Sequence, residues 1–363
     1  MNIQDIDTPA VLIDFDTMDR NLRRMASYCA AHNLTLRPHT KTHKIPEIAR
    51  LQMQYGAGGI TVAKIGEAEV MADAGLNDIV IVYPIWGEMK WKRVAALAKR
   101  VKISVAIDSF QVAAGISQTA KAAGVEVGIR LEFDTGLRRC GLTLDAESIE
   151  IAKKIFEFPG LRWEGISLYP GHIMGNREIR ELDIPLENAK LDRLYSLLDS
   201  AGIPYRVVSG GNTPAAFESH RFHRVTEIRP GTYVFNDRNT VDAESASYSD
   251  CAVTVLTTVV STSVPHRAIV DAGSKTLSAD TLLSGDRKHF GYVQGHPEFM
   301  LEDLSEEHGH IAIPDDSATK VGDRLRIVPN HVCPCINLHD RAFVVRGDLV
   351  IDQWKVAARG KVT

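Results

Sequence analysis

The sequence has few cysteines and no long hydrophobic run. Its five cysteines are scattered along 363 residues, and their odd number argues against a disulfide framework and for a reducing compartment. No apolar stretch approaches the roughly 20 residues that span a bilayer. The opening residues, MNIQDIDTPAVLIDFD, carry acids where a signal peptide has a basic start. We therefore expect a cytoplasmic protein without a membrane segment.

Charge of one sign is not in excess either. The formal net charge is −4, with 42 basic and 46 acidic residues mixed along the chain. This balance argues against a basic face for nucleic acid and a polybasic anchor for a membrane, so neither is an expected partner. The hydrophobic fraction of 44% and the charged fraction of 24% are ordinary for a globular protein, and the length suits one barrel-sized domain with a smaller one.

Short β-branched or apolar runs alternate with amphipathic helical runs from about residue 34 to 237. Eight such repeats in one segment predict a (β/α)8 barrel of the TIM type. A doubly wound open sheet is the alternative, but the first strand is not followed by the G-x-G-x-x-G fingerprint of its dinucleotide-binding form. The predicted strands are Leu34–Pro38, Gly59–Ala63, Ile79–Tyr83, Ile103–Ile107, Val125–Glu132, Trp163–Leu168, Tyr205–Ser209 and Val225–Pro230.

From about Cys251 the segments are strand-like, with hardly a helical stretch between them, which predicts an all-β C-terminal domain. The opening segment DTPAVLIDFD is expected to pair into this domain. The predicted fold class is therefore α/β, with a barrel over residues 25–245 and a β domain over residues 1–24 and 246–363. The charged, glycine-containing stretch from Leu301 to Val321 is predicted to be a loop.

The stretch LRPHTKTHKIP, at the end of the first predicted strand, gathers bases without an acid. Lys41 lies here among His39, His43 and Lys44, at the end of the strand where barrel enzymes carry their sites. A lysine amine in such a place can form a Schiff base with a carbonyl group, and His39 could support the bound compound. A solvated basic loop is the alternative interpretation, and this stretch alone does not decide between them.

Two further strand ends carry candidate site residues. After the fifth strand, DTGLRRCG offers Arg138 and Arg139, which suit an anionic group or a phenolate oxygen, although Arg138 equally fits an exposed loop. After the sixth strand, LYPGH offers Tyr169, a flat ring with a hydroxyl that suits a cofactor, and His172, a proton acceptor. Taken alone, His172 is more commonly an ordinary loop histidine.

The loops after the seventh and eighth strands favour a phosphate. SGGNTP and RPGTYVFND combine glycines, small hydroxyls and a helix start, whose backbone N–H groups can face phosphate oxygens. A phosphate-bearing cofactor together with a Schiff-base lysine indicates pyridoxal phosphate. A sugar-phosphate aldolase, the alternative, would place its lysine on a later strand. The candidate cofactor residues in these loops are Ser209, Gly210, Gly211, Asn212, Thr213, Gly231, Thr232 and Tyr233.

The segment PNHVCPCINLHD carries two candidate metal ligands, His331 and Cys333. On the strand that we predict here, both side chains point to one face. Histidine and cysteine suit a borderline metal such as zinc, and with two protein ligands the shell needs water and substrate. A β-turn with a buried cysteine is the alternative. The nearby residues that fit turns, solvated loops or bystander positions are Glu307, His308, Cys335, His339 and Asp340.

Several motifs, in matching order over nearly the whole chain, resemble one known family. They are RPHTKTHK, GEAEV, RCG, SGGNTP, RPGTYVFND, DAGSK, SEEHG, PNHVC with NLHD, and the closing WKVAARG. This pattern is similar to the D-threonine aldolase and D-serine dehydratase group of fold-type III, alanine-racemase-like enzymes that use pyridoxal 5'-phosphate. The combination of PHxKTHK with HxC is the discriminating pair.

The resemblance implies a barrel with a β domain, in a head-to-tail homodimer with active sites at the interface. It also implies that pyridoxal phosphate is attached to Lys41 and that Arg139 contacts its phenolic oxygen. A divalent metal, Mn, Mg or Zn, is implied at His331 and Cys333. The strand-seven and strand-eight loops would hold the phosphate.

We therefore expect an aldolase that cleaves D-threonine-like β-hydroxy-α-amino acids to glycine and an aldehyde, with Lys41 and His172 as catalytic residues. The base that removes the hydroxyl proton is either His172 or a metal-bound water. ITVAKIGEAEV and YPIWG resemble aldolase members. The alternative is a dehydratase that converts D-serine or D-3-hydroxyaspartate to a keto acid and ammonia. The resemblance supports it because dehydratases of the group typically have a cysteine at the position of Cys333, where some aldolases have an aspartate. A racemase is disfavoured because Tyr292 is the only tyrosine after Ser249, and a non-catalytic cofactor carrier because such carriers usually lack the β domain.

Overall fold

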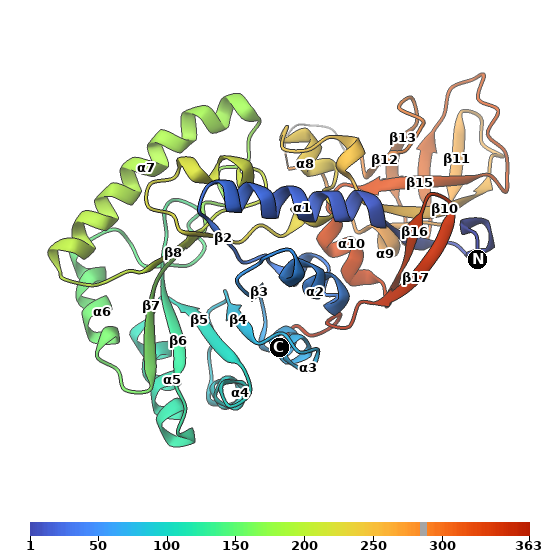
Figure 1. Ribbon diagram of the computed structural model, residues 1–363. Helices are drawn as coiled ribbons and strands as arrows, with labels where there is room; N and C mark the ends of the chain where they lie inside the picture. Colours follow the sequence, from blue (N-terminus) through green and yellow to red (C-terminus); the bar gives the residue numbers. More distant parts are fainter. Residues whose placement is uncertain (284–288) are drawn as a thin grey trace. The chain divides into compact units, whose positions relative to one another are not determined.

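We describe a computed structural model of the chain, in which residues 1–283 and 289–363 are placed (Figure 1). The chain forms two compact units, which we call the barrel unit and the sheet unit. Helix α1 (Phe15–Ala31) passes from one unit to the other after Arg23. Among the placed residues, no helix is long and apolar enough to cross a membrane. The barrel unit comprises Arg24–Lys41, Pro46–Gly231 and Gly360–Thr363, and the sheet unit comprises Met1–Arg23, Thr42–Ile45 and Thr232–Arg359.

Eight parallel strands form the centre of the barrel unit, in the order β2-β9-β8-β7-β6-β5-β4-β3. A parallel bridge between His39 and Thr61 links the two edges of this sheet, and the Thr61 hydroxyl donates to the carbonyl oxygen of Arg37. The predicted TIM-type barrel and all eight predicted strands are thereby confirmed. The strands are β2 (Thr35–Leu36), β3 (Ile60–Val62), β4 (Asp78–Ile81), β5 (Lys102–Ile107), β6 (Val127–Phe133), β7 (Leu161–Leu168), β8 (Val207–Gly210) and β9 (Glu227–Ile228).

Helices follow most of these strands and bury one face against them. Capping residues fix where they begin: Ser109 and Asp145 each accept a hydrogen bond from a backbone N–H three residues later, at the starts of α5 and α6. Gly124 ends α5 in the left-handed conformation. The helices are α2 (Pro46–Gln54), α3 (Ile65–Asp73), α4 (Glu88–Ala98), α5 (Phe110–Ala123), α6 (Ala146–Phe156) and α7 (Arg177–Ser200).

Nine strands form the sheet unit, in the order β11-β14-β13-β12-β15-β10-β1-β16-β17. Strand β1 pairs antiparallel with β10 and parallel with β16, which confirms that the DTPAVLIDFD segment joins the C-terminal sheet. Three short helices accompany the strands: α8 (Arg238–Asp242), α9 (Ser274–Leu277) and α10 (Val332–Leu338). The strands are β1 (Ala10–Asp14), β10 (Val253–Ser261), β11 (Arg267–Val270), β12 (Gly291–Val293), β13 (Met300–Leu304), β14 (Gly309–Ala312), β15 (Arg324–Pro329), β16 (Arg341–Arg346) and β17 (Leu349–Lys355).

Two predictions for this unit are wrong. The stretch predicted as a loop contains most of the β13–β14 hairpin, in which Leu301 and Ile311 are fully buried while charged residues face outward. The segment after β15, predicted as a strand, is helix α10 with His331 at its N-cap. Pro334 explains the second error, because its missing N–H costs little in the first turn of a helix and is not tolerated in a central strand.

Candidate functional site

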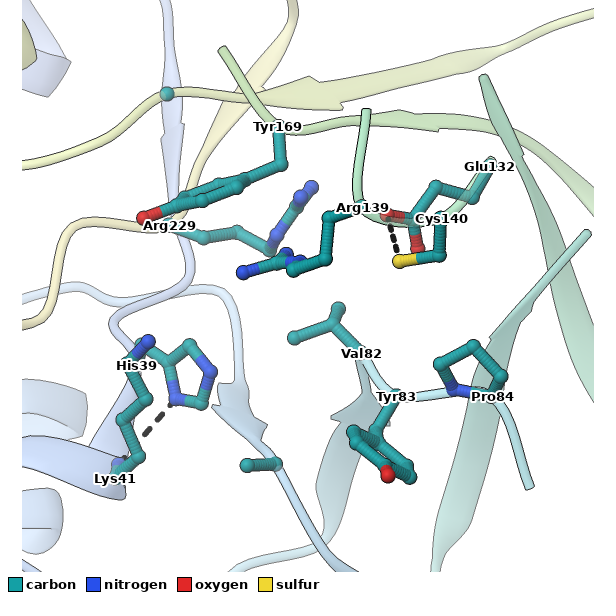
Figure 2. A pocket seen from close by; sticks show the side chains of 12 residues that line it. His39, Lys41, Val82, Tyr83, Pro84, Glu132, Arg139, Cys140, Tyr169 and Arg229 are labelled. Atoms are coloured by element: carbon teal, nitrogen blue, oxygen red, sulfur yellow. Dashed lines mark hydrogen bonds between the residues drawn. The ribbon is translucent and has the colours of Figure 1, made fainter. Parts of the chain in front are cut away.

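The ends of the barrel strands surround a cavity of about 370 Å³, which lies within the usual range for small-molecule sites. Figure 2 shows that cationic side chains from distant parts of the sequence point into it. Its lining residues are His39, Lys41, Ala63, Val82, Tyr83, Pro84, Glu132, Arg139, Cys140, Tyr169, Gly211 and Arg229.

Lys41 lies in a short 3-10 turn, Thr40–Thr42, that closely follows β2. Its backbone N–H donates to Nδ1 of His39 at 3.3 Å, and both side chains line the cavity (Figure 2). The next two bases of the stretch, His43 and Lys44, belong to the sheet unit. The structure therefore separates the four bases and brings His39 and Lys41 to the cavity.

Arg139 and Tyr169 meet at the cavity although they follow different strands. The guanidinium carbon of Arg139 is 4.6 Å from the centroid of the Tyr169 ring, a cation–π contact. Asp134 shapes the arginine loop, because its carboxylate accepts the backbone N–H groups of Gly136 and Arg138. Arg138 is exposed, with a φ of 58°, and it is not among the lining residues. The predicted choice of Arg139 over Arg138 agrees with this placement.

The loop after β8 is shaped to hold an anion. Gly211 has a φ of +88°, and a Cβ atom there would lie 3.3 Å from the Cβ of Ile228, so a side chain would be strained. In the described part of the chain, the backbone N–H groups of Gly211, Asn212 and Thr213 have no acceptor. The Asn212 side chain holds the loop by accepting the Ala215 N–H at 2.9 Å. Gly211 lines the cavity, and three successive donors of this kind would suit a phosphate group.

The other predicted cofactor residues after β8 and β9 do not line the cavity. The side chain of Ser209 is fully buried, and the Gly210 carbonyl oxygen accepts a bond within the barrel. Gly231 ends the longest segment of the barrel unit, while Thr232 and Tyr233 belong to the sheet unit. The predicted contacts of these residues with a cofactor stay predictions.

Sequence reasoning missed two charged side chains of the cavity, Glu132 and Arg229, each 6% exposed. Burial raises the pKa of the Glu132 carboxyl, against the opposing effect of the Arg229 guanidinium. Burial also lowers the pKa of Arg229 to about 10. The Cys140 thiol donates to Oε1 of Glu132 at 3.4 Å. For Glu132 the signal was the run VGIRLEF of β6, because a strand that is buried along its whole length holds charged side chains only where they have partners.

His172 follows β7, and it is not among the described residues that line the cavity. Its Nε2 is 3.5 Å from Oε2 of Glu187, a side chain that is only 2% exposed. Glu187 also pairs with Lys190 at 3.4 Å, and Lys190 donates to the carbonyl oxygen of Thr135 at 2.5 Å. The Glu187 carboxylate is therefore an acidic neighbour of this imidazole. Whether His172 reaches a substrate stays a prediction.

The sheet unit brings His331 and Cys333 together at the start of α10, where the imidazole and the thiol interact. The thiol of Cys333 donates to the hydroxyl of Thr42 at 3.2 Å, and the hydroxyl of Thr232 lies 3.8 Å from the same sulfur. The predicted proximity of the two candidate ligands is therefore retained, although a helix start and not a strand produces it.

Asp237 completes this cluster, and sequence reasoning missed it. Its fully buried carboxylate lies 3.1 Å from Nδ1 of His331 and accepts the Val332 N–H at 3.0 Å. Burial lowers the pKa of His331, but Cys333 and Asp237 outweigh that effect and raise it to about 11. Because Nδ1 faces the carboxylate, Nε2 is the nitrogen left for a ligand.

This donor set fits a divalent ion with an open shell. Nitrogen and sulfur suit a borderline metal, and a carboxylate on the second nitrogen is the usual partner of a metal-bound histidine. Within residues 1–283 and 289–363, no cluster of three or more His, Cys, Asp or Glu side chains could hold a metal. An ion held by His331 and Cys333 alone would keep positions for water or substrate, as catalytic metals do.

Other candidates of the C-terminal half have structural partners. The Cys335 thiol donates to the carbonyl oxygen of Thr276 at 3.4 Å, and Nε2 of His339 lies 3.0 Å from the same oxygen. Lys275 pairs with Glu307 at 3.0 Å, which joins the DAGSK and SEEHG segments at the surface. These contacts favour packing roles over ligand binding.

Known families and proteins are similar to both units of the chain. Residues 13–239 match the family described as alanine racemase, N-terminal domain, and residues 252–345 match the putative serine dehydratase domain. A D-threonine aldolase from Arthrobacter sp. is 34% identical over 98% of this chain and 93% of its own. The crystal structure of D-threonine aldolase from Filomicrobium marinum has a TM-score of 0.92 at 31% identity, covering 99% of this chain and 98% of that one. The structure of D-threo-3-hydroxyaspartate dehydratase from Delftia sp. HT23 has a TM-score of 0.89 at 31% identity, covering 98% of each chain.

These relatives are enzymes whose names specify small amino-acid substrates, and they match both units of the chain. The matched residues 13–239 include the lysine stretch and the loop after β8, and the matched residues 252–345 include the HVC segment of the sheet unit. The protein is therefore an enzyme of the D-threonine aldolase and D-serine dehydratase family, an alanine-racemase-like group that depends on pyridoxal 5'-phosphate.

Proposed function

We propose that the protein is a homodimeric aldolase that cleaves D-β-hydroxy-α-amino acids, such as D-threonine, to glycine and an aldehyde. Pyridoxal phosphate and a divalent metal would serve the reaction. The observation that carries the proposal is the cavity of the barrel unit, which gathers the Lys41 amine, two guanidinium groups and an anion-binding loop. Similarity to D-threonine aldolases over nearly the whole chain supports the choice of reaction.

The proposed roles at the cavity follow from the chemistry of each group. Lys41 would hold the cofactor covalently through its amine, and Arg139 would face the phenolic oxygen. The backbone N–H groups of Gly211, Asn212 and Thr213 would bind the phosphate. Once bound, pyridoxal phosphate supplies an electron sink for the bond that breaks.

The proposed roles for the β-hydroxyl fall to other residues. His331 and Cys333 would hold a divalent ion, which supplies a Lewis acid for this hydroxyl. His172, oriented by Glu187, would take the hydroxyl proton as the Cα–Cβ bond breaks. Asp237 would keep the His331 ring in place for the ion.

A dehydratase is the second candidate. The resemblance implies a cysteine at the position of Cys333 in dehydratases of the group, and the dehydratase from Delftia sp. HT23 is nearly as similar in structure as the aldolase, with TM-scores of 0.89 and 0.92. In that reaction Lys41 would remove the proton from Cα, and loss of the β-hydroxyl would lead to a keto acid and ammonia.

The products from two substrates distinguish these reactions. Incubated with D-threonine, the purified protein is expected to form glycine and acetaldehyde in equal amounts, with little keto acid or ammonia. D-Serine should be converted more slowly, and L-threonine not at all, since the chemistry requires the D configuration at Cα. The measurement is chromatography of amino acids and derivatised carbonyl products. Keto acid as the main product from both D-amino acids would reject the aldolase in favour of the dehydratase.

Asp237→Asn tests the proposed metal site through the residue that holds the His331 ring. The amide keeps the size of the side chain but offers Nδ1 of His331 a weaker partner than the carboxylate. We expect metal affinity to fall by about 10- to 100-fold, as is typical when such a partner is lost. Competition with a chromophoric chelator measures this affinity without reference to activity. Unchanged affinity in a folded variant would show that the carboxylate does not support a metal-bound histidine.

A further inference from the structure

Arg229 is tied to the strands of the barrel, in contrast to the other cavity arginine. Its Nη2 donates to the carbonyl oxygen of Leu168 at 2.8 Å, and its Nη1 donates to the hydroxyl of Ser209. These acceptors belong to β7 and β8, and Ser209 is fully buried. Arg139 stands on a loop and lies over the ring of Tyr169. The two guanidinium groups are therefore held in different ways.

The hydroxyl of Ser209 has one orientation that satisfies its neighbours. Its Oγ lies 2.5 Å from Oε1 of Glu227. Burial raises the pKa of Glu227, but Arg130 and Arg37 outweigh burial and bring it to about 2, so that at neutral pH the carboxylate only accepts hydrogen bonds. A guanidinium only donates them. Ser209 must therefore donate to Glu227 and accept from Arg229.

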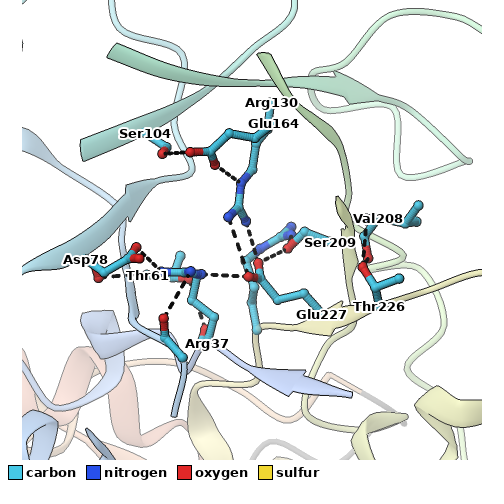
Figure 3. Close-up of polar contacts among 12 residues, drawn as sticks. Arg37, Thr61, Asp78, Ser104, Arg130, Glu164, Val208, Ser209, Thr226 and Glu227 are labelled. Carbon is cyan, nitrogen blue, oxygen red and sulfur yellow. Dashed lines mark hydrogen bonds and ion pairs between the residues drawn. The ribbon is translucent and has the colours of Figure 1, made fainter. Parts of the chain in front are cut away.

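Glu227 is the centre of a buried network of charges (Figure 3). Its carboxylate accepts Nε of Arg37 at 2.7 Å and Nη1 of Arg130. Arg37 also forms an ion pair with Asp78 at 2.6 Å, and Arg130 forms one with Glu164 at 3.0 Å. The members come from the ends and middles of several barrel strands, which hold side chains more rigidly than loops do. Through Ser209, this rigidity extends to Arg229 at the cavity.

We propose that Ser209 is a positioning residue that couples Arg229 of the cavity to the buried carboxylate of Glu227. This role differs from the direct cofactor contact that the sequence predicts, because the hydroxyl is committed to the barrel interior. A guanidinium held in this way keeps its positive charge at one place in the cavity. The expected effect on cofactor binding rests on the proposed function, in which the ligand of the cavity is anionic.

Ser209→Ala removes the coupling hydroxyl and leaves the strand. In a crystal structure of the cofactor-free variant, we expect the Arg229 guanidinium to leave its original position. Titration with pyridoxal phosphate should show binding that is weaker by about tenfold or more, because the displaced guanidinium would lose a hydrogen bond to the anionic ligand. The absorption maximum of the bound cofactor should also shift, because a charge near its ring has moved. Ser209→Thr keeps the hydroxyl and should restore both properties.

Ser104→Ala is the matched control, because Ser104 is a buried hydroxyl of β5 that donates to Glu164 at 2.8 Å in the same network. It should lower the melting temperature about as much as Ser209→Ala, yet leave Arg229, the cofactor affinity and the absorption maximum unchanged. An Arg229 that stays in place in the Ser209→Ala structure would overturn the inference. If the wild-type protein binds no pyridoxal phosphate, the proposed function fails, while the position of Arg229 still decides the role of Ser209.

Discussion

Replacing Lys41 by alanine is expected to abolish the visible absorption band of the bound cofactor and to lower kcat/KM by about 10³-fold or more. A Schiff base requires a primary amine, and Lys41 is the lysine among the described residues that line the cavity. In the proposed dehydratase reaction the same amine would also transfer a proton, a step that by itself contributes about 10²- to 10⁴-fold in enzymes. Absorption spectra of the protein after saturation with pyridoxal phosphate and removal of the excess measure the first effect. Steady-state kinetics with D-threonine measure the second.

Two variants make this test specific. Lys41→Arg keeps the positive charge but has no primary amine, so it should lose the band as completely as alanine does. Lys44→Ala removes a lysine of the same basic stretch, whose Nζ donates to Oδ1 of Asn337 at 2.7 Å in the sheet unit, and should keep the band. A band that survives in both Lys41 variants would show that another amine carries the cofactor, and the assignment would be wrong.

The second large effect is expected at the start of α10. Cys333→Ala and His331→Ala should each deprive the protein of its metal and of most of its activity, because only one protein ligand would remain. The metal affinity should fall by more than the about 10- to 100-fold that is typical when a hydrogen-bond partner of a metal ligand is removed. Metal content is measured by mass spectrometry after gel filtration, and activity is measured before and after treatment with EDTA. Adding metal back should restore the wild-type protein but neither variant.

Cys335→Ala is the control for this prediction, since its thiol is fully buried and donates to the carbonyl oxygen of Thr276. It should retain metal and activity. If Cys333→Ala were fully active with no metal present, the ion would have no part in the reaction. If wild-type protein lost metal to EDTA without losing activity, the same conclusion would follow.

The barrel could be predicted because its evidence is local. Buried parallel strands need apolar residues on both faces, so each strand is a short apolar run that can be recognised without knowing its partners. Ile79 and Ile103, for instance, stand in neighbouring strands in direct register, and each was visible within its own run. The placement of Lys41 followed from the same reasoning, since barrel sites gather where strands end.

The residues missed at the site depend on partners far along the chain. Asp237 and His331 are separated by 94 positions, and no spacing rule connects them. Arg229 was quoted as part of a phosphate loop, but its role at the cavity depends on Ser209 and Leu168 from other strands. Hydrogen-bond partners of this kind become visible only when the strands are assembled.

The two errors in the sheet unit have a different cause, because the local signals there were ambiguous. In the β13–β14 hairpin, one face is exposed and charged, so its period-two pattern resembled a polar loop. At His331 and Cys333, alternation suggested a strand, while Pro334 was the local signal for a helix start. The two side chains are adjacent in either conformation, so their predicted proximity holds although the predicted secondary structure is wrong. Their role as metal ligands stays a prediction.

The charged network inside the barrel also bears on how the chain folds. Arg37 and Glu227 are 190 positions apart, and Arg130 and Glu227 are 97 apart. Such distant groups meet only after long loops have closed, late in the assembly of the ring. A partly built barrel that already excluded water would leave one partner of each pair buried alone, at a cost of about 3–5 kcal/mol. The network therefore disfavours incomplete barrels, and it makes the stability of the first strand of the barrel depend on that of the last.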